Sequence, residues 1–519
     1  MDIDRISLFR RLYIGSIIIL FFGLVFSKLA ISLAQFSLLA VWFLEKDYNS
    51  KFKRLKQDIP ALIFLSIFTL FLIGILWTDN FDAGLKALKL KLPILVIPFL
   101  ISSSKPISKK ELKILLFSFI VIVFAKSIQS LIIFISNEYI SSIQKLNPKI
   151  SHIRLSLIID FAIFATIYLL RKDFFTKSSQ KYISILVILW FIVSLFIIQS
   201  VTGFVILIIV ILALSTAYFF RLKNKHLKYF FLFITIIIPI ALIIYINYQF
   251  QDFYTFKDPN YNDLPEYTEQ GNKYTHDSTN IYIENGYYVG YYLCEKELKK
   301  EWNERSTIKY DSTDINGYKI KYTLKRYLTS LGLPKDSTGV KSLTDKDIKS
   351  IEKSISNVRF NNKININNRI YKIIWQFHIY LKTKNPNNQS LTQRIEFTKT
   401  AINIIKKNTL FGVGTGDLKQ AFADQYIEDN SKLEQKNRYT THNQYISFIV
   451  VFGVILGTWC ILALFLPFFI NKKYKEFLPS IFFIIAMFSM LNEDTLETSI
   501  GISFFTIFYS LLILQKLKE

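Results

Sequence analysis

The sequence is poor in the residues that build disulfide frameworks and metal centres. Its 519 residues include only 2 cysteines and 5 histidines. Cys294 stands in a polar region and Cys460 in an apolar run, so we do not expect them to pair. The polar region must therefore fold without a disulfide. The chain also has no CxxC or HExxH pattern, which argues against a structural zinc site.

Charged residues are missing from long stretches of the chain. Hydrophobic residues make up 51% of it, including 48 Phe, and several apolar runs approach the ~20 residues that cross a bilayer as a helix. The sequence predicts an all-α polytopic membrane protein without a cleavable signal, because the first run leads into further spans. About twelve spans are expected, at 11–26, 29–44, 60–77, 84–102, 112–136, 154–170, 182–199, 202–220, 229–248, 444–469, 477–491 and 499–514.

Lysine and arginine are absent from some short loops and present in the alternate ones. The segments 45–59, 103–111 and 221–228 contain them, whereas "TDNFD", "QSV" and "LNEDTLET" do not. This positive-inside pattern predicts that both termini are cytoplasmic. It also accounts for much of the net charge of +24, so no nucleic-acid partner is expected. The exceptions on the opposite side are Lys28, Lys145 and Lys149.

One long polar region interrupts the apolar pattern. We expect an N-terminal transmembrane bundle of about nine spans at 1–248, a large outer loop domain at 249–443, and about three C-terminal spans at 444–519. Within the loop, Asn285-Gly286 predicts a tight hairpin, and "EKELKKEWNERS" and "RIEFTKTAINIIKKN" predict helices. The loop is therefore expected to be a mixed, mainly helical domain.

A histidine and an asparagine stand where this loop meets the tenth span. His442 is expected in the first turn of that helix, with Thr440 or Thr441 as its cap. The positive end of a helix dipole disfavours imidazolium, and a neutral imidazole can accept a proton. This placement makes His442 a candidate general base. The alternative is an interfacial histidine that only hydrogen-bonds a carbonyl group.

Two arginines are placed near the predicted outer membrane edge. Arg154 begins the sixth span, and Arg394 begins the helix that leads to "FGVGTGD". Arginine suits phosphate oxygens because it offers two donors in a fixed geometry. The alternatives are that Arg154 reaches lipid headgroups and that Arg394 forms a surface ion pair.

The segment "GVGTGD" at 412–417 is not a nucleotide-binding loop, because it follows a helix and lacks the lysine of a P-loop. We expect Gly412 and Gly414 to bring the backbone close to a pyrophosphate or to the membrane surface. A simple turn that ends a helix is the alternative.

Several charges stand in or beside the predicted spans. Lys126 and Asp160 lie within spans, where charges are costly, and are expected to pair. Glu493, Asp494 and Glu497 make the last outer turn acidic. We expect these three to be solvated; the alternative is that they orient an arginine.

Two stretches together resemble a known family. "QRIEFTKTAINIIKKNTLFGVGTGDLKQAF", followed by "THNQYISFIVVFGVILG", is similar to the hallmark region of the O-antigen ligase and polymerase superfamily. Its pattern is an arginine-led helix, a glycine turn, and a His-Asn pair opening a span that contains a GxxxG-like step, here Gly453 and Gly457. The arrangement of many spans before a large outer loop is also similar.

The resemblance implies a membrane-embedded inverting glycosyltransferase in the bacterial inner membrane, with its active site facing the periplasm. Its donor would be a glycan on undecaprenyl pyrophosphate, and its acceptor a hydroxyl of lipid A-core, another glycan or a protein. No metal or other cofactor is implied. By resemblance His442 is catalytic, and Arg394 binds the pyrophosphate with Asn443, Gly412 and Gly414 around it.

The sequence departs from the family pattern at one position. Members commonly carry a Ser-Arg pair at the start of a span, whereas here Ser200 is followed by Val201. We expect Arg154 to supply the missing guanidinium.

Two other classes of function stay open at this point. A transporter or flippase of lipid-linked sugars would place functional charges throughout the spans and would not need a His-Asn pair at the exit of a large outer domain. A structural or adaptor membrane protein would use that domain only to bind partners.

Overall fold

The structure is a computed structural model that describes residues 3–136, 147, 150–362, 365–387 and 389–516. Nearly all regular structure in these residues is helical, and one two-stranded hairpin is the sheet among them. The predicted all-α membrane fold is therefore confirmed at this level. Lys145 and Lys149, which were exceptions in the charge pattern, lie outside the described residues.

The chain divides into two compact units, which we describe separately. The first unit comprises the described parts of 1–136, 146–214 and 393–519. Its helices are α1 (Ile3–Phe26), α2 (Lys28–Leu44), α3 (Tyr48–Gln57), α4 (Ile59–Ile73), α5 (Phe81–Ser103), α6 (Lys109–Ser136), α7 (His152–Arg171), α8 (Ser178–Ile198), most of α9 (Val201–Arg221), most of α16 (Ser390–Lys407), α17 (Leu418–Glu428), α18 (Gln444–Ile470), α19 (Phe477–Ser489) and α20 (Ser499–Tyr509), which continues as a π-helix over Ser510–Leu514.

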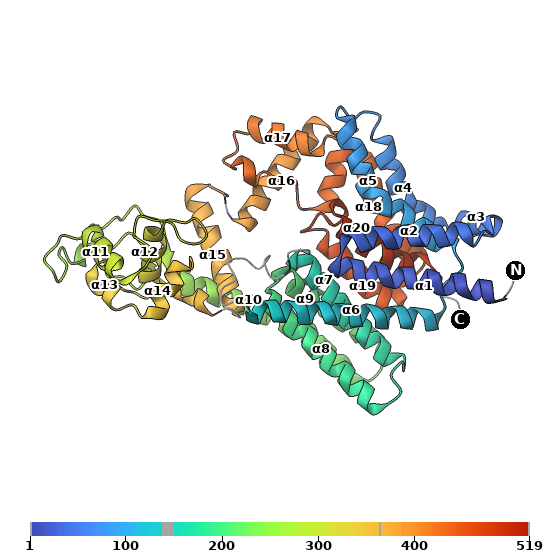
Figure 1. Ribbon diagram of the computed structural model, residues 1–519, viewed down its shortest axis with the longest axis horizontal. Helices are drawn as coiled ribbons and strands as arrows, with labels where there is room; N and C mark the ends of the chain where they lie inside the picture. The colour runs from blue at the N-terminus through green and yellow to red at the C-terminus, as the bar shows by residue number, and fades with distance from the viewer. Residues whose placement is uncertain (1–2, 137–146, 148–149, 363–364, 388, 517–519) are drawn as a thin grey trace. The chain divides into compact units, whose positions relative to one another are not determined.

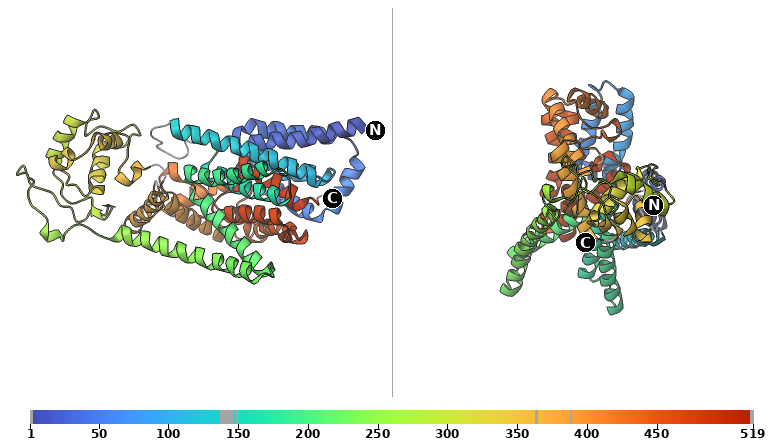
Figure 2. Two further views of the ribbon diagram at one scale, coloured as in Figure 1. Left: turned by 90° about the horizontal axis from the view of Figure 1, so that it is seen from below. Right: turned by 90° about the vertical axis from the view of Figure 1, so that its left-hand side faces the viewer.

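Every predicted apolar run forms a helix, but the count of twelve spans is not confirmed. Among the described residues, seven helices are long and apolar enough to cross a membrane: α1, α6, α7, α8, α9, α18 and α10 of the second unit. Three apolar helices, α4, α19 and α20, are shorter, and α2 and α3 are bent by 116° to one another. α1 lies alongside α2 and α6, as Figures 1 and 2 show.

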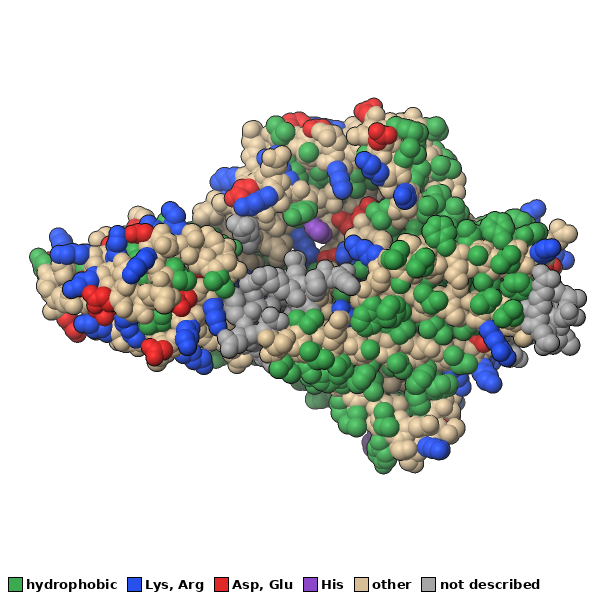
Figure 3. All heavy atoms as spheres, viewed as in Figure 1, with side chains coloured by type: hydrophobic (Ala, Val, Ile, Leu, Met, Phe, Trp, Pro, Cys, Tyr) green, Lys and Arg blue, Asp and Glu red, His purple; other side chains and the backbone are tan. Residues whose placement is uncertain are grey.

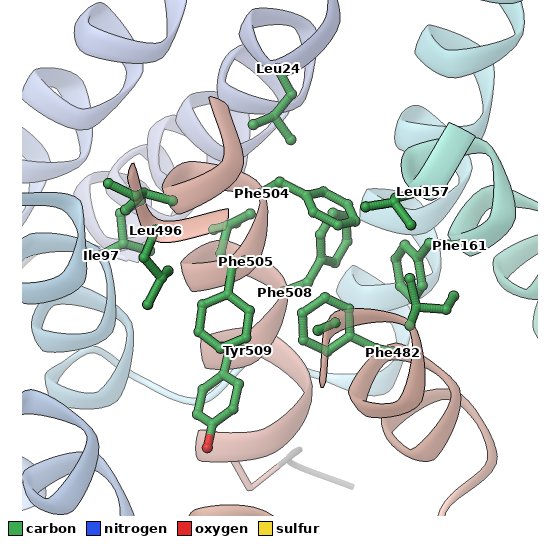
Figure 4. Packing of buried hydrophobic residues seen from close by; sticks show 14 of the residues in the cluster. Leu24, Ile97, Leu157, Phe161, Phe482, Leu496, Phe504, Phe505, Phe508 and Tyr509 are labelled. Atoms are coloured by element: carbon green, nitrogen blue, oxygen red, sulfur yellow. The ribbon is translucent and has the colours of Figure 1, made fainter. Parts of the chain in front are cut away.

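The shortness of α20 follows from its position in the core. Every residue from Ile500 to Leu514 is buried, and a helix that is apolar on all sides packs inside a protein or a membrane. Phe508 contacts Phe161 of α7 at a ring-centroid distance of 4.5 Å, and Phe505 stacks on Phe482 of α19 at 6.2 Å (Figure 4). The aromatic contacts of α20 therefore join α7 and α19, which frame the candidate site.

Helix α18 is broken at Gly453, where φ is +74°. The break frees the carbonyl groups of Val450 and Val451, which accept instead from the backbone amides of Val413 and Gly414, each at 2.9 Å. Polar backbone groups at membrane depth need such substitute partners. The glycine-rich segment thus closes the break in the helix that carries the candidate histidine.

The second unit comprises the described parts of 137–145 and 215–392. Its elements are α10 (Lys225–Tyr254), β1 (Ile283–Glu284), β2 (Tyr287–Tyr288), α11 (Glu295–Arg305), α12 (Ile320–Ser330), α13 (Ser337–Lys341), α14 (Asp345–Glu352) and α15 (Ile366–Thr383). Asn285 and Gly286 both have positive φ between the paired strands, as the predicted hairpin requires. The contact-based division differs from the predicted domains, because α10 belongs to this unit and residues 393–443 to the first.

The two units differ in their surfaces. Around α11–α14, Trp302, Tyr327 and neighbouring apolar residues form a separate core. On the face seen in Figure 3, Lys, Arg, Asp and Glu gather over this unit, whereas hydrophobic side chains cover much of the first. Such apolar cover is typical of helices that face lipid, in keeping with a multi-pass membrane protein.

Replacing Gly453 with alanine is expected to destabilise the first unit. A Cβ there would collide with the Leu410 carbonyl, and the positive φ strains any L-residue with a side chain, at a cost of about 1–3 kcal/mol. Gly15→Ala is the matched control, because no atom lies within 4 Å of a Cβ at that position in α1. Thermal unfolding of the detergent-purified variants measures both. Equal melting temperatures for wild type and Gly453→Ala would contradict this account of the break.

Candidate functional site

His442 lies immediately before α18 rather than in its first turn. The N-cap is Asn443, whose Oδ1 accepts from the backbone amides of Tyr445 at 3.0 Å and Ile446 at 3.2 Å. The prediction that Thr440 or Thr441 caps the helix was therefore wrong, because an Asx side chain one residue further along satisfies these amides. The Asn443 Nδ2 also donates to the Leu491 carbonyl at 3.1 Å. These bonds give Asn443 a structural role.

The His442 backbone has a left-handed conformation, with φ of +51°. This conformation is uncommon for a residue with a side chain and persists where surrounding bonds impose it. The imidazole is half-buried beside the rings of Phe397, at 5.7 Å between centroids, and Tyr439, at 6.0 Å. Neither ring nitrogen makes a hydrogen bond within the described part of the chain. The alternative in which His442 only bonds a carbonyl therefore has no support, and its nitrogens are available to a ligand.

The carboxylate of Asp494 holds the segment that carries His442. Its Oδ2 accepts from the His442 backbone amide at 2.9 Å and from the Thr440 hydroxyl at 3.2 Å. Its Oδ1 accepts from the hydroxyls of Ser447, at 2.9 Å, and Thr441, at 3.3 Å. Asp494 is 6% exposed, so four donors replace the water that it loses on burial. Asp494 thereby fixes the backbone of His442.

The neighbouring residue, Glu493, lies between the two candidate arginines. Its Oε1 is 3.3 Å from Nη2 of Arg394, and its Oε2 is 3.6 Å from Nη2 of Arg154. Arg394 also donates to the Asn492 side chain. The turn between α19 and α20 thus joins both arginines to the histidine segment. The expectation that this acidic turn is solvated was wrong, because helices distant in sequence cover it and supply its donors.

Arg394 keeps its charge in this setting. Burial lowers the pKa of Arg394 from its ordinary value, while the carboxylates of Glu493 and Asp494 act in the opposite direction. An arginine pKa begins above about 12, so the guanidinium remains a cation near neutral pH.

The turn at which the resemblance predicts an arginine packs against α7, the helix that carries Arg154. The Ser200 hydroxyl, in the turn where the resemblance predicts an arginine, lies 2.8 Å from the Ser156 hydroxyl in the first turn of α7. A Cβ on Gly203 would come within 2.6 Å of the Ser156 Cβ, so the two backbones are closely packed. Arg154 lies two residues before Ser156 in the same helix.

A small cleft, partly open to solvent, adjoins these charges. Arg154 and Glu493 line it, and most of its other lining is apolar, including Leu157, Ile158 and Phe504. Such a lining suits a ligand that carries both a charged group and a hydrocarbon chain.

Gly412 and Gly414 have packing roles that need no ligand. The Gly412 amide donates to the Asn408 carbonyl at 3.0 Å, and the Gly414 amide donates to α18 across its break. A Cβ on Gly412 would collide with the Val451 carbonyl. Because both amides are already bonded, these glycines do not enter the donor site proposed below.

The predicted pair of charges within the spans does not form. The Lys126 Nζ donates to Gln129 at 2.9 Å, and both carboxylate oxygens of the buried Asp160 have no hydrogen-bond partner among the described residues. No group of three or more His, Cys, Asp or Glu side chains in the described ranges is arranged to hold a metal ion.

Residues 350–461 match the family model of O-antigen ligase. This match supports the resemblance to the O-antigen ligase superfamily over that part of the chain. Members of this family are ligases and polymerases related to glycosyltransferases, which implies a lipid-linked glycan donor and an acceptor. The match includes Arg394 and His442 and excludes Arg154, Glu493 and Asp494. No curated protein matches the chain.

The structure brings together residues that the sequence left apart. Arg154, Arg394 and Glu493 meet from three distant parts of the chain, and the segment of His442 is bonded to the next residue, Asp494. The sequence favoured solvation for Glu493 and Asp494 and left contact with an arginine as the alternative, so neither was predicted as a site residue. The sequence does contain a signal for this turn. The triplet "NED", with one amide and two carboxylates, stands between two short apolar helices.

Removing the Asp494 carboxylate is expected to loosen the segment around His442. Asp494→Ala leaves the Thr440 hydroxyl and the His442 amide without their acceptor, so the amides of this segment should exchange with solvent at least tenfold faster. Hydrogen–deuterium exchange with mass spectrometry measures this rate. Glu493→Gln is the control from the same turn, because its side chain contacts only the arginines. Unchanged exchange in Asp494→Ala would show that other contacts hold the segment.

Proposed function

We propose that the protein is a ligase-type glycosyltransferase that transfers a glycan from undecaprenyl pyrophosphate to a hydroxyl of lipid A-core or another acceptor. Transfer takes place at the periplasmic face of the bacterial inner membrane and does not use a metal. It inverts the configuration at the anomeric carbon of the donor sugar. One observation carries the proposal: Asp494 accepts from the backbone amide of His442, and the preceding residue, Glu493, contacts both arginines, so adjacent residues of one buried turn join the histidine segment to the arginine pair.

Each group has a role in a single displacement. The acceptor oxygen attacks the anomeric carbon while the bond from that carbon to the pyrophosphate oxygen breaks. His442 takes the proton from the attacking hydroxyl, as a neutral imidazole can. Arg394 and Arg154 stabilise the negative charge that grows on the departing pyrophosphate. Inversion follows because attack and departure occur on opposite faces of the sugar.

The surroundings support these roles. The ring of His442 has no internal hydrogen-bond partner in the described chain, so its nitrogen can face an acceptor. Its backbone is fixed by Asp494, which keeps the base in one place and lowers the cost of ordering it during reaction. The partly apolar cleft beside Arg154 supports a donor whose lipid stays in a hydrocarbon environment while its headgroup reacts.

His442→Ala is expected to abolish transfer while leaving donor binding nearly unchanged, because the proton moves only in the chemical step. Loss of a general base costs about 10²–10⁴-fold in rate. His442→Gln should be equally inactive, since an amide bonds but does not take the proton. The assay uses purified protein, lipid-linked donor, and lipid A-core, a glycan repeat and a peptide as separate acceptors, so it also identifies the acceptor class.

Two comparisons make the histidine test decisive. His226→Ala, at an exposed position, should retain normal turnover. Turnover close to wild type in His442→Gln would end the assignment of His442 as general base and would favour a structural role for this residue.

Arg394→Ala and Arg154→Ala are each expected to weaken binding of undecaprenyl pyrophosphate by roughly ten- to hundredfold, because a hydrogen bond to a charged group contributes about 1.5–3 kcal/mol. Lysine at either position should restore binding only in part, since it lacks the planar pair of donors. Affinity is measured with purified protein in nanodiscs, with the exposed Arg11→Ala as control. Undiminished binding in Arg154→Ala would remove that residue from the donor site.

A further inference from the structure

The Glu493 carboxylate has an unusual set of partners. Its side chain is only 9% exposed, yet the two guanidinium groups of Arg154 and Arg394 are its sole side-chain partners within the described chain. One carboxylate oxygen faces each arginine. Its neighbour in the same turn, Asp494, accepts four hydrogen bonds from groups that do not belong to the arginine pair. The turn therefore carries one firmly held carboxylate and one held only by two cations.

Both contacts of Glu493 are loose. The distances of 3.3 Å and 3.6 Å exceed the 2.7–2.9 Å typical of charge-assisted hydrogen bonds between nitrogen and a carboxylate oxygen. Arg394 is anchored separately by the Asn492 side chain, so its position does not depend on Glu493 alone. The contacts therefore neutralise charge more than they fix geometry.

A phosphate group needs the same donors that Glu493 now faces. A carboxylate and a phosphate each present two oxygens to a pair of guanidinium groups, and the Nη2 atoms that point at Glu493 cannot serve both fully. Glu493 also lines the small, partly open cleft beside Arg154.

Resting on the proposed function, we infer that Glu493 is an internal counter-ion that takes the place of a donor phosphate in the empty site and competes with it. In the empty protein the carboxylate offsets the repulsion between two neighbouring cations. Pyrophosphate must displace it from at least one arginine on binding. After transfer, the return of the Glu493 carboxylate to the arginines favours release of the undecaprenyl pyrophosphate product. Glu493 therefore sets donor affinity without taking part in the proton transfer.

The test compares binding of undecaprenyl pyrophosphate to wild type and Glu493→Gln in nanodiscs. Glutamine keeps the shape and removes the charge, so the affinity should rise about tenfold and dissociation should slow. Inorganic pyrophosphate should show the same direction, whereas undecaprenol, which lacks phosphate, should bind both proteins equally. Glu428→Gln is the control and should leave the affinity for undecaprenyl pyrophosphate unchanged, because this exposed carboxylate pairs with Lys407 and does not contact the arginines.

A second variant, Glu493→Asp, provides an independent test if Glu493→Gln does not fold. Glu493→Asp keeps the charge but is one methylene shorter, so it cannot reach both arginines and should also bind undecaprenyl pyrophosphate more tightly than wild type. Weaker or equal binding in either folded variant would overturn the counter-ion role, and weaker binding in both would show that Glu493 instead orients the arginines for the donor.

The result is separable from the proposed function. If both arginine variants lose affinity while Glu493→Gln gains none, the counter-ion role alone fails. If neither arginine variant loses affinity, the donor site itself fails, whatever Glu493→Gln shows.

Discussion

The burial of one carboxylate, that of Asp494, is the constraint on which the candidate site depends. A buried carboxylate needs donors, and this one finds them in the backbone and hydroxyls around His442. The same bonds impose the left-handed backbone at His442, which would otherwise relax. Because Asp494 follows Glu493 directly, fixing one residue also positions the other beside Arg154 and Arg394. A single short turn thus links the segment of His442 to both arginines.

That turn is in its place because of the helices around it. α19 and α20 are too short to be simple spans and are buried along most of their length. The aromatic contacts between α20, α7 and α19 hold the three helices together, and the turn that joins α19 to α20 carries Glu493 and Asp494. Sites supported by packed elements hold their side chains more accurately than sites on mobile loops.

The fold was more predictable from the sequence than the site. Hydropathy located every apolar helix, because long apolar runs have few alternatives, but it did not show that α20 packs centrally or that α18 breaks at Gly453. The pattern around His442 and Arg394 singled out both residues as candidates. The cap at Asn443 was missed because threonine and asparagine are both good caps, and only the backbone geometry chooses between them. The burial of Glu493 and Asp494 depends on partners 47–339 positions away in the chain, which no local pattern contains.

The two acidic neighbours show how one turn can meet opposite demands. A general base works best when its position is fixed, and Asp494 provides this with four bonds to the segment of His442. The proposed site must bind a pyrophosphate donor and then release a pyrophosphate product, so its cations should not hold phosphate too tightly. In this proposal the loose contacts of Glu493 with both arginines weaken their attraction for phosphate. A carboxylate saturated with donors stays in place, whereas one held only by two cations yields to a stronger anion. The difference between these adjacent side chains lies in their partners, and the partners are set by how α7, α16 and α18 meet the turn.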